Sequence, residues 1–287
     1  MRILITGGTG TVGSALVSEL LGSEHELLVL TRSEQKAAAL PEGVTPVCGD
    51  LLDPATVRRV FDGVDSLFLL NATSPSECQE GLMAVNGARL AGVKRIVYAS
   101  AMGLEGAAHI PHLGAKVAIE TAVKESGISY TILRPNNFYQ NDHWFKDALV
   151  EHGVYPQPFG NIGMSRVDVG DIAHAAALAL TSTRGEGETF NLVGPEVLTG
   201  ESSAAAWSEA LGREIVYGGD DLDAFEAATL EWLPAVLVFD YRLMFAHFQA
   251  HGVRASDRDL ERQYELIGRE PRRFADFARE TASVWLS

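Results

Sequence analysis

The chain opens with Met1-Arg-Ile-Leu-Ile-Thr-Gly-Gly-Thr-Gly-Thr-Val-Gly13, a short apolar strand followed by three glycines spaced Gly7-x-x-Gly10-x-x-Gly13. Apolar residues at helical spacing begin directly behind it. In this arrangement the first glycine permits a tight turn, the second lets the backbone approach a pyrophosphate, and the third lets helix and strand pack closely. We therefore expect a dinucleotide-binding loop rather than a plain glycine-rich turn. The expected contacts come from Gly7, Thr9, Gly10, Thr11, Val12 and Gly13.

Composition and charge narrow the function classes. The 287 residues are 46% hydrophobic and 21% charged, which is typical of a globular protein. A net charge of −15 disfavours nucleic acid and anionic membrane surfaces as partners. No apolar run reaches the roughly 18 residues of a membrane span, and the first strand leaves no room for a signal peptide, so we expect a cytoplasmic protein. Neither the two cysteines nor the histidines have the spacing of a metal site, and no metal is expected.

Strand and helix patterns alternate regularly after the first helix. Strands are expected at His25–Thr31, Val44–Cys48, Ser66–Leu70, Arg95–Ser100, from Ser129, and at Thr189–Val193. This alternation predicts an α/β fold of the Rossmann type, with a doubly wound parallel sheet. Behind it the chain is mostly helical, with helices expected over 200–211, 221–250, 256–266 and 271–286. We expect residues 1–153 with 165–193 to bind the dinucleotide, and 154–164 with 194–287 to form a smaller, mostly helical substrate-binding region.

The residues behind the second strand favour NADP over NAD. A site for NAD usually offers an acid to the ribose 2′-hydroxyl here, whereas an arginine accommodates the 2′-phosphate of NADP. Arg32 stands at the end of the strand with Lys36 one turn beyond, while Glu34, the nearby acid, lies past the strand end. The alternative interpretation is that Arg32 is only a solvated surface charge. Asp50, at the end of the third strand, can accept a hydrogen bond from the adenine amino group.

One helix carries the residues expected to do chemistry. His112, Lys116 and Glu120 stand at i, i+4 and i+8 and so share a face. The structural alternative is an exposed ion pair between Lys116 and Glu120, with His112 serving only as a helix-start residue beside Pro111.

Several runs of this sequence resemble a known family. GGTGTVG, the TR after the second strand, GDLLDP, YASAMG and HLGAKVAIETAVKESGISYTILRPNNFYQN are similar to the NmrA-like branch of the atypical short-chain dehydrogenases/reductases. The likeness covers nearly the whole chain. Members of that branch include NADPH-dependent quinone reductases, triphenylmethane-dye and azo reductases, and regulatory proteins that bind dinucleotide without turning it over.

The resemblance implies a set of contacts with NADP. The glycines would hold the pyrophosphate, Arg32 and Lys36 the 2′-phosphate, Asp50 and Leu51 the adenine, and Lys116 the nicotinamide ribose. The remaining expected cofactor contacts are Asn71, Ala72, Ser100 and Asn136. His112 stands where the wider superfamily has its proton-donating tyrosine. The NmrA-like branch as a whole also lacks that tyrosine. The missing tyrosine therefore leaves the resemblance to the NmrA-like branch intact, but the alcohol–ketone chemistry usual in the wider superfamily is not implied.

These observations favour an NADPH-dependent reductase that passes hydride to a flat, conjugated small molecule such as a quinone, a dye or a polyketide-like aromatic. His112 and Lys116 are the candidate catalytic residues. One alternative is an NADP(H)-sensing regulatory protein without turnover, and another is a non-redox cyclase or isomerase that uses His112 as acid or base. The oligomeric state is left open between monomer and homodimer.

Overall fold

A computed structural model describes all 287 residues and divides them into two compact units. Unit 1 comprises Met1–Pro135, Val169–Asn191 and Glu265–Ile267. Unit 2 comprises Asn136–Asp168, Leu192–Tyr264 and Gly268–Ser287. The division differs from the expected one at residues 136–153, 165–168 and 192–193, which belong to unit 2, and at 265–267, which belong to unit 1. The chain leaves the first unit where its sixth strand ends, at Pro135. The binding roles expected of the two parts stay predictions.

Unit 1 is built on a seven-stranded sheet of order β3-β2-β1-β4-β5-β6-β8. The pairs from β3 across to β6 are parallel. The strands are β1 (Arg2–Ile5), β2 (Glu26–Thr31), β3 (Val44–Cys48), β4 (Ser66–Leu69), β5 (Arg95–Ala99), β6 (Ser129–Pro135) and β8 (Glu188–Leu192). The strand order reverses between β1 and β4, which makes their carboxyl ends the topological switch point where such sheets bind ligands. The predicted Rossmann-type fold is confirmed.

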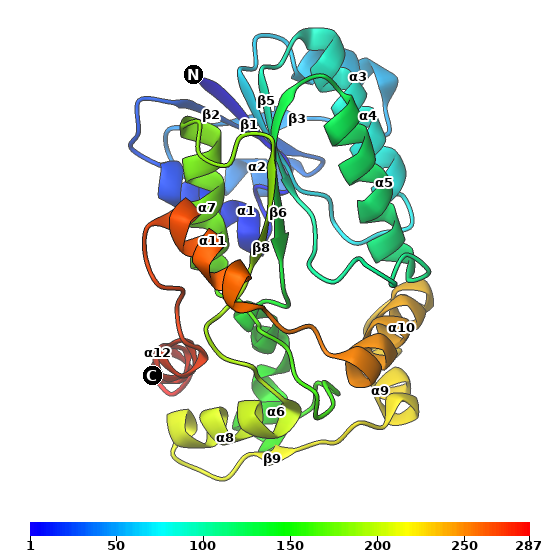
Figure 1. The fold of residues 1–287 in the computed structure, drawn as a ribbon, viewed down its shortest axis with the longest axis vertical. Coiled ribbons are helices and arrows are strands. Elements are labelled where there is room, and N and C mark those ends of the chain that lie inside the picture. Colours follow the sequence, from blue (N-terminus) through cyan, green and yellow to red (C-terminus); the bar gives the residue numbers. More distant parts are fainter. The chain divides into compact units, whose positions relative to one another are not determined.

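Helices cover both faces of this sheet (Figure 1). α1 (Thr11–Leu20) packs with α7 (Val169–Thr181) on one face. On the other face, α4 (Glu77–Ala91) packs against α3 (Pro54–Val60) and α5 (Pro111–Glu125). The short α2 (Glu34–Ala38) follows β2 and is capped by the Ser33 hydroxyl. An added Cβ at Gly81 of α4 would lie 2.4 Å from the Ile119 side chain of α5, so the two helices are held at a fixed, close distance.

Unit 2 consists mainly of helices around one small sheet, in which β7 (Val154–Tyr155) pairs with β9 (Val216–Tyr217). Its helical segments are the 3₁₀ helix η1 (Tyr139–Phe145), α6 (Lys146–Val150), α8 (Gly200–Leu211), α9 (Leu222–Thr229), α10 (Ala235–His251), α12 (Phe274–Trp285) and most of α11 (Asp257–Ile267). The last three residues of α11, Glu265–Ile267, belong to unit 1. The single helix expected over 221–250 is wrong, because α9 ends at Thr229 and α10 begins after Pro234. Proline lacks the N–H that a continuous helix needs at that point.

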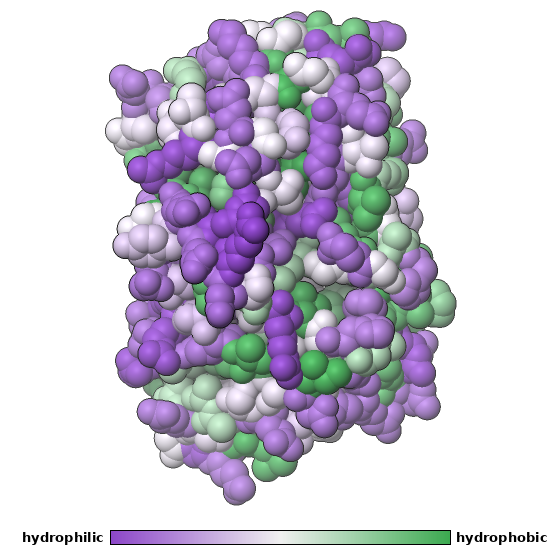
Figure 2. All heavy atoms as spheres, viewed as in Figure 1, coloured by the Kyte–Doolittle hydropathy of each residue, from purple (hydrophilic) through white to green (hydrophobic).

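Large apolar side chains are exposed at scattered positions in both units. The face of the chain shown in Figure 2 is mostly hydrophilic, with apolar residues scattered among the polar ones. The exposed apolar side chains of unit 2 include Trp144 and Trp232, each more than half exposed, whose rings stand at 85° with centroids 6.1 Å apart. No helix has the length and apolar character needed to cross a membrane.

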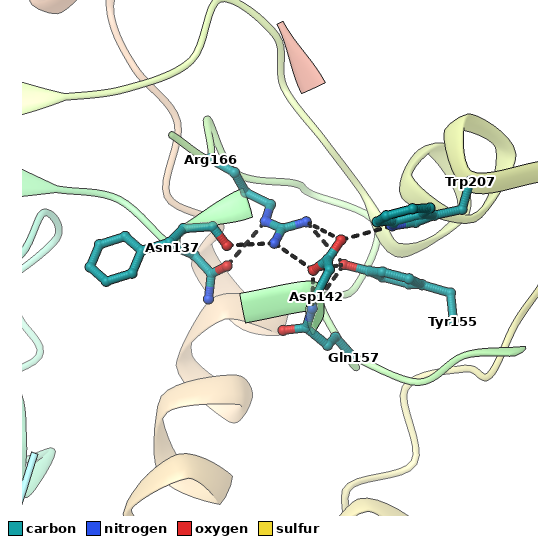
Figure 3. Close-up of polar contacts among 7 residues, drawn as sticks. Asn137, Asp142, Tyr155, Gln157, Arg166 and Trp207 are labelled. Carbon is teal, nitrogen blue, oxygen red and sulfur yellow. Dashed lines mark hydrogen bonds and ion pairs between the residues drawn. The ribbon is translucent and has the colours of Figure 1, made fainter. Parts of the chain in front are cut away.

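A buried arginine holds the centre of unit 2 together (Figure 3). Arg166 and Asp142 are both fully buried, and their closest nitrogen and oxygen atoms are 2.6 Å apart. The same carboxylate accepts hydrogen bonds from Trp207 Nε1 at 2.8 Å and from the Tyr155 hydroxyl at 3.3 Å. Arg166 also donates to the side chain of Asn137 at 3.0 Å. Residues from widely separated parts of the chain thus meet at one satisfied ion pair.

We expect Arg166→Met to lower the free energy of unfolding by about 3–5 kcal/mol, because Asp142 would remain buried without its cation. Urea denaturation measures this loss. Arg279→Met is the matched control, since Arg279 forms an ion pair with Asp276 in the same unit but is largely exposed. That variant should lose less than about 1 kcal/mol. Similar small losses in both variants would contradict the structural role assigned to Arg166.

Candidate functional site

The loop between β1 and α1 depends on two glycines for its shape. Gly7 adopts a left-handed conformation with φ of 65°, which glycine reaches without strain. A Cβ at Gly13 would lie 2.2 Å from the carbonyl oxygen of Gly7 and 2.6 Å from the Cα of Gly8. No side chain fits there, so the glycine at position 13 is what allows α1 to start directly against the loop.

Gly10 differs from these two because its surroundings are open. It is exposed, and an added Cβ would meet only the Gly7 carbonyl oxygen, at 3.3 Å. Gly10 is also the N-cap residue directly before α1, and no side chain caps the helix there. The first N–H groups of an uncapped helix carry partial positive charge and bind anions such as phosphates. Apart from this one tight contact, packing leaves room for a side chain at position 10, whereas a phosphate bound to the backbone would exclude one.

A buried amide lies beside this loop at the end of β4. The Thr6 hydroxyl donates to the Leu70 carbonyl at 2.9 Å, and the Leu70 N–H donates back to that hydroxyl at 2.8 Å. This exchange ties the ends of β1 and β4 together at the switch point. Asn71 follows; it is only 6% exposed, and neither its Nδ2 nor its Oδ1 has a hydrogen-bond partner. A buried amide without hydrogen-bond partners is costly unless a ligand satisfies it. Both this amide and the open backbone at Gly10, called the cradle below, fit a bound dinucleotide.

The residues expected to contact the adenosine half of the cofactor follow β2 and β3, at the same edge of the sheet. Arg32 is exposed after β2, with Nη1 3.8 Å from Oε1 of Glu80 in α4. Lys36 is exposed on α2. Asp50 follows β3 and uses Oδ1 to accept from the backbone N–H two residues on, at 2.9 Å, while Leu51 is buried. Their contacts with a cofactor stay predictions.

The face of α5 that carries His112 and Lys116 is turned inward. Both residues are 8% exposed. Lys116 Nζ donates to Oε1 of Glu77 at 2.6 Å, and Glu77, in the first turn of α4, is fully buried. The alternative of an exposed Lys116–Glu120 ion pair is therefore wrong, since both side chains are buried and have other partners.

Glu120 forms a separate network with the ends of β5 and β6. Its carboxylate accepts from the Ser100 hydroxyl at 2.6 Å and from Arg134 Nε at 2.7 Å. Burial alone raises the pKa of this carboxyl, but the hydrogen bonds from Arg134 and Ser100 outweigh it and hold the pKa below its usual range. The Tyr98 hydroxyl lies buried without a hydrogen-bond partner. Burial raises the pKa of Tyr98 strongly, and the charges of Glu77 and Glu120 raise it further.

Two expected contacts have other uses in the structure. The Ser100 hydroxyl already donates its proton to Glu120, so while that hydrogen bond is kept it can contact a cofactor only as an acceptor. Asn136 belongs to unit 2, where its Nδ2 donates to the Val253 carbonyl and its Oδ1 accepts from the next backbone N–H, both at 2.8 Å. Ala72 is exposed directly after Asn71.

Sequence reasoning did not identify the acids of α4. Glu77 and Glu80 are buried in its first turn, on the stripe that continues through Gly81, Ala84, Val85 and Ala88. That i, i+3, i+4, i+7 spacing marks the inward face of a helix. Acids at such positions signal buried partners, and this was the available clue.

Comparisons with known proteins show which family the chain belongs to. The chain is 31% identical over 288 residues to an NAD(P)H azoreductase of Xenophilus azovorans, covering 99% of each chain. It is 30% identical over 284 residues to a (4-alkanoyl-5-oxo-2,5-dihydrofuran-3-yl)methyl phosphate reductase of Streptomyces griseus, again with 99% of each covered. The structure of an NADPH-dependent quinone oxidoreductase of Escherichia coli complexed with NADPH superposes with a TM-score of 0.84 at 26% identity, covering 99% of this chain and 100% of that one. The model of the NmrA-like family matches residues 1–272, and the chain belongs to that family.

Proposed function

We propose that the protein is an NADPH-dependent reductase that transfers hydride to a conjugated small molecule. The observation that carries the proposal is the open cradle at Gly10, where an uncapped helix start lies at the switch point of the sheet. The full-length similarity to proteins named as an azoreductase and as a reductase of a dihydrofuranylmethyl phosphate supports a redox activity. We also place the protein in the cytoplasm, acting on a small molecule as monomer or homodimer.

Each part of the cofactor has a matching group in unit 1. The backbone N–H groups at the start of α1 would hold the pyrophosphate, and the Arg32 guanidinium would bind the 2′-phosphate. The orphaned amide of Asn71 would accept and donate hydrogen bonds on the nicotinamide side. Bound NADPH supplies a hydride, and the protein's contribution is to orient the donor and exclude water.

The acceptor class follows from the proton donor. No tyrosine stands one turn before Lys116, where His112 lies instead. An electron-poor or cationic acceptor needs little help from an acid when it takes hydride. A quinone gains one hydride and one proton on each reduction to the hydroquinone, and His112 is the side chain that would supply that proton. In unit 2, the exposed rings of Trp144 and Trp232 offer flat apolar surfaces suited to conjugated compounds.

One assay tests the proposal. Purified protein is incubated with NADPH and a panel of quinones, azo compounds and triarylmethane dyes while absorbance at the NADPH band is followed. Oxidation of NADPH that depends on the acceptor supports the reductase. Tight binding of NADPH without turnover of any acceptor favours the regulatory alternative, and absence of binding contradicts the proposal.

We expect Gly10→Val and Gly13→Val to fail in different ways. Gly10→Val should lower the free energy of unfolding by less than about 1 kcal/mol but abolish NADPH binding, because the new side chain fills the cradle. Gly13→Val should lose about 3 kcal/mol or more, because its Cβ overlaps the Gly7 backbone. Denaturation and calorimetric titration separate the two effects. A folded Gly10→Val protein that keeps its affinity would refute the phosphate cradle.

We expect NADPH to bind at least about tenfold more tightly than NADH, since a charge-assisted contact from Arg32 to the 2′-phosphate contributes about 1.5–3 kcal/mol. Calorimetric titration of the parent protein and of Arg32→Ala with both cofactors measures the preference. Arg32→Ala should lose it by weakening NADPH alone. Lys94→Ala, which removes an exposed cation in the same unit, is the control. Equal affinities in the parent protein would contradict the assignment.

We expect His112→Phe to leave cofactor affinity intact and to depress kcat for a quinone, which develops negative charge, while barely changing kcat for a cationic dye. Lys116→Ala should instead lower turnover of both acceptors, because it disturbs cofactor placement and leaves Glu77 buried without its cation. Steady-state kinetics of both variants on one acceptor of each class makes the comparison. Equal losses for both acceptors in His112→Phe would mean that the ring only shapes the pocket.

A further inference from the structure

The cation expected to read the 2′-phosphate already has an anionic neighbour in unit 1. Arg32 Nη1 lies 3.8 Å from Glu80 Oε1. That separation is within ion-pair range but beyond hydrogen-bond distance, so Glu80 attracts the guanidinium without fixing its orientation. The side chain of Arg32 is 63% exposed, whereas that of Glu80 is only 11% exposed. The carboxylate is therefore the stationary member of the pair.

Several contacts keep Glu80 in place. The Ser76 hydroxyl, which leaves α4 without a side-chain cap, donates to Glu80 Oε1 at 2.8 Å and lies 3.1 Å from the Ser74 hydroxyl. The next residue, Gly81, packs directly against Ile119 of α5. An acid in the first turn of a helix also complements the helix dipole. These contacts restrain Glu80 when another anion approaches Arg32.

We propose that Glu80 sets the degree to which the site prefers NADPH over NADH, because its fixed carboxylate competes with the 2′-phosphate for Arg32. This inference rests on the proposed function. A 2′-phosphate bound to Arg32 would draw the guanidinium away from Glu80. The phosphate would also lie within a Debye length of the Glu80 carboxylate, so the two negative charges would repel each other. Both effects lower the affinity for NADPH. NADH has no phosphate at this position and leaves the Arg32–Glu80 pair undisturbed. Glu80 therefore lowers the affinity for NADPH and not that for NADH.

The opposite role for Glu80 would be to support Arg32 in a phosphate-binding orientation. The two roles differ in the sign of one measurement, since removing a competitor tightens NADPH binding and removing a support weakens it. Glu80→Gln is the suitable change, because the amide oxygen can still accept the hydrogen bond from Ser76 while the charge is lost.

The experiment titrates folded, full-length parent protein and Glu80→Gln with NADPH, NADH, adenosine 2′,5′-bisphosphate and 5′-AMP at one low ionic strength. The last two ligands isolate the adenosine end and need no turnover. We expect Glu80→Gln to bind NADPH and the bisphosphate roughly three- to tenfold more tightly, with NADH and 5′-AMP unchanged. Glu34→Gln is the matched control, because it removes an exposed acid two residues from Arg32 that has no ion pair with it. It should shift NADPH affinity by less than twofold, roughly.

A double variant tests the route through Arg32. In an Arg32→Ala background, Glu80→Gln should tighten binding of the bisphosphate by a smaller factor than in the parent, since the competition for Arg32 is gone. Weaker or unchanged NADPH binding in Glu80→Gln, or equal shifts for NADPH and NADH, overturns the inference while leaving the proposed function intact. A folded parent protein that binds neither cofactor overturns both.

Discussion

A Cβ at position 13 would lie 2.2 Å from the carbonyl oxygen of Gly7, and this steric limit determines where α1 can begin. Because Gly13 has no side chain, the helix starts against the turn that ends β1. Its uncapped N–H groups then lie at the switch point of the sheet, next to the strand end where Thr6 and Leu70 exchange hydrogen bonds. The buried amide of Asn71 is positioned by the same strand end. One missing methyl group therefore brings a helix dipole, an open backbone and an orphaned amide to one place.

Features of this kind could be predicted from the sequence because they depend on local backbone rules. Glycine spacing after an apolar strand indicates the phosphate loop, and regular alternation of strands and helices indicates the parallel sheet. The break between α9 and α10 obeys an equally local rule, since Pro234 cannot continue a helix. The spacing of apolar residues, taken alone, did not reveal this break. Spacing of this kind does not establish burial either, since Trp232, Val236 and Phe239 are all more than half exposed.

Partners of buried charges could not be predicted, because periodicity shows which residues face inward but not what they meet. Lys116 was expected either to touch the cofactor or to pair with Glu120, one turn away. It pairs with Glu77, 39 residues earlier in the chain, rather than with Glu120, and its contact with the cofactor stays a prediction. Asp142 and Arg166 are likewise 24 residues apart in the sequence, and their contact depends on the tertiary arrangement of unit 2. Each buried acid needs a cation, but only the folded chain identifies it.

The three buried acids on the α4 and α5 side of the sheet hold their cations with unequal strength. Lys116 donates to Glu77 at 2.6 Å, and Arg134 donates to both oxygens of Glu120 at 2.7 and 2.8 Å. These short, charge-assisted hydrogen bonds are largely buried and lock both partners. Arg32 approaches Glu80 only to 3.8 Å and remains mostly exposed. A screened pair of this kind is weaker than the two buried ones, so we infer that Arg32, rather than Lys116 or Arg134, is the cation that a phosphate would draw from its carboxylate. The difference in geometry separates the ion pairs that hold the fold from the one that is available to a ligand.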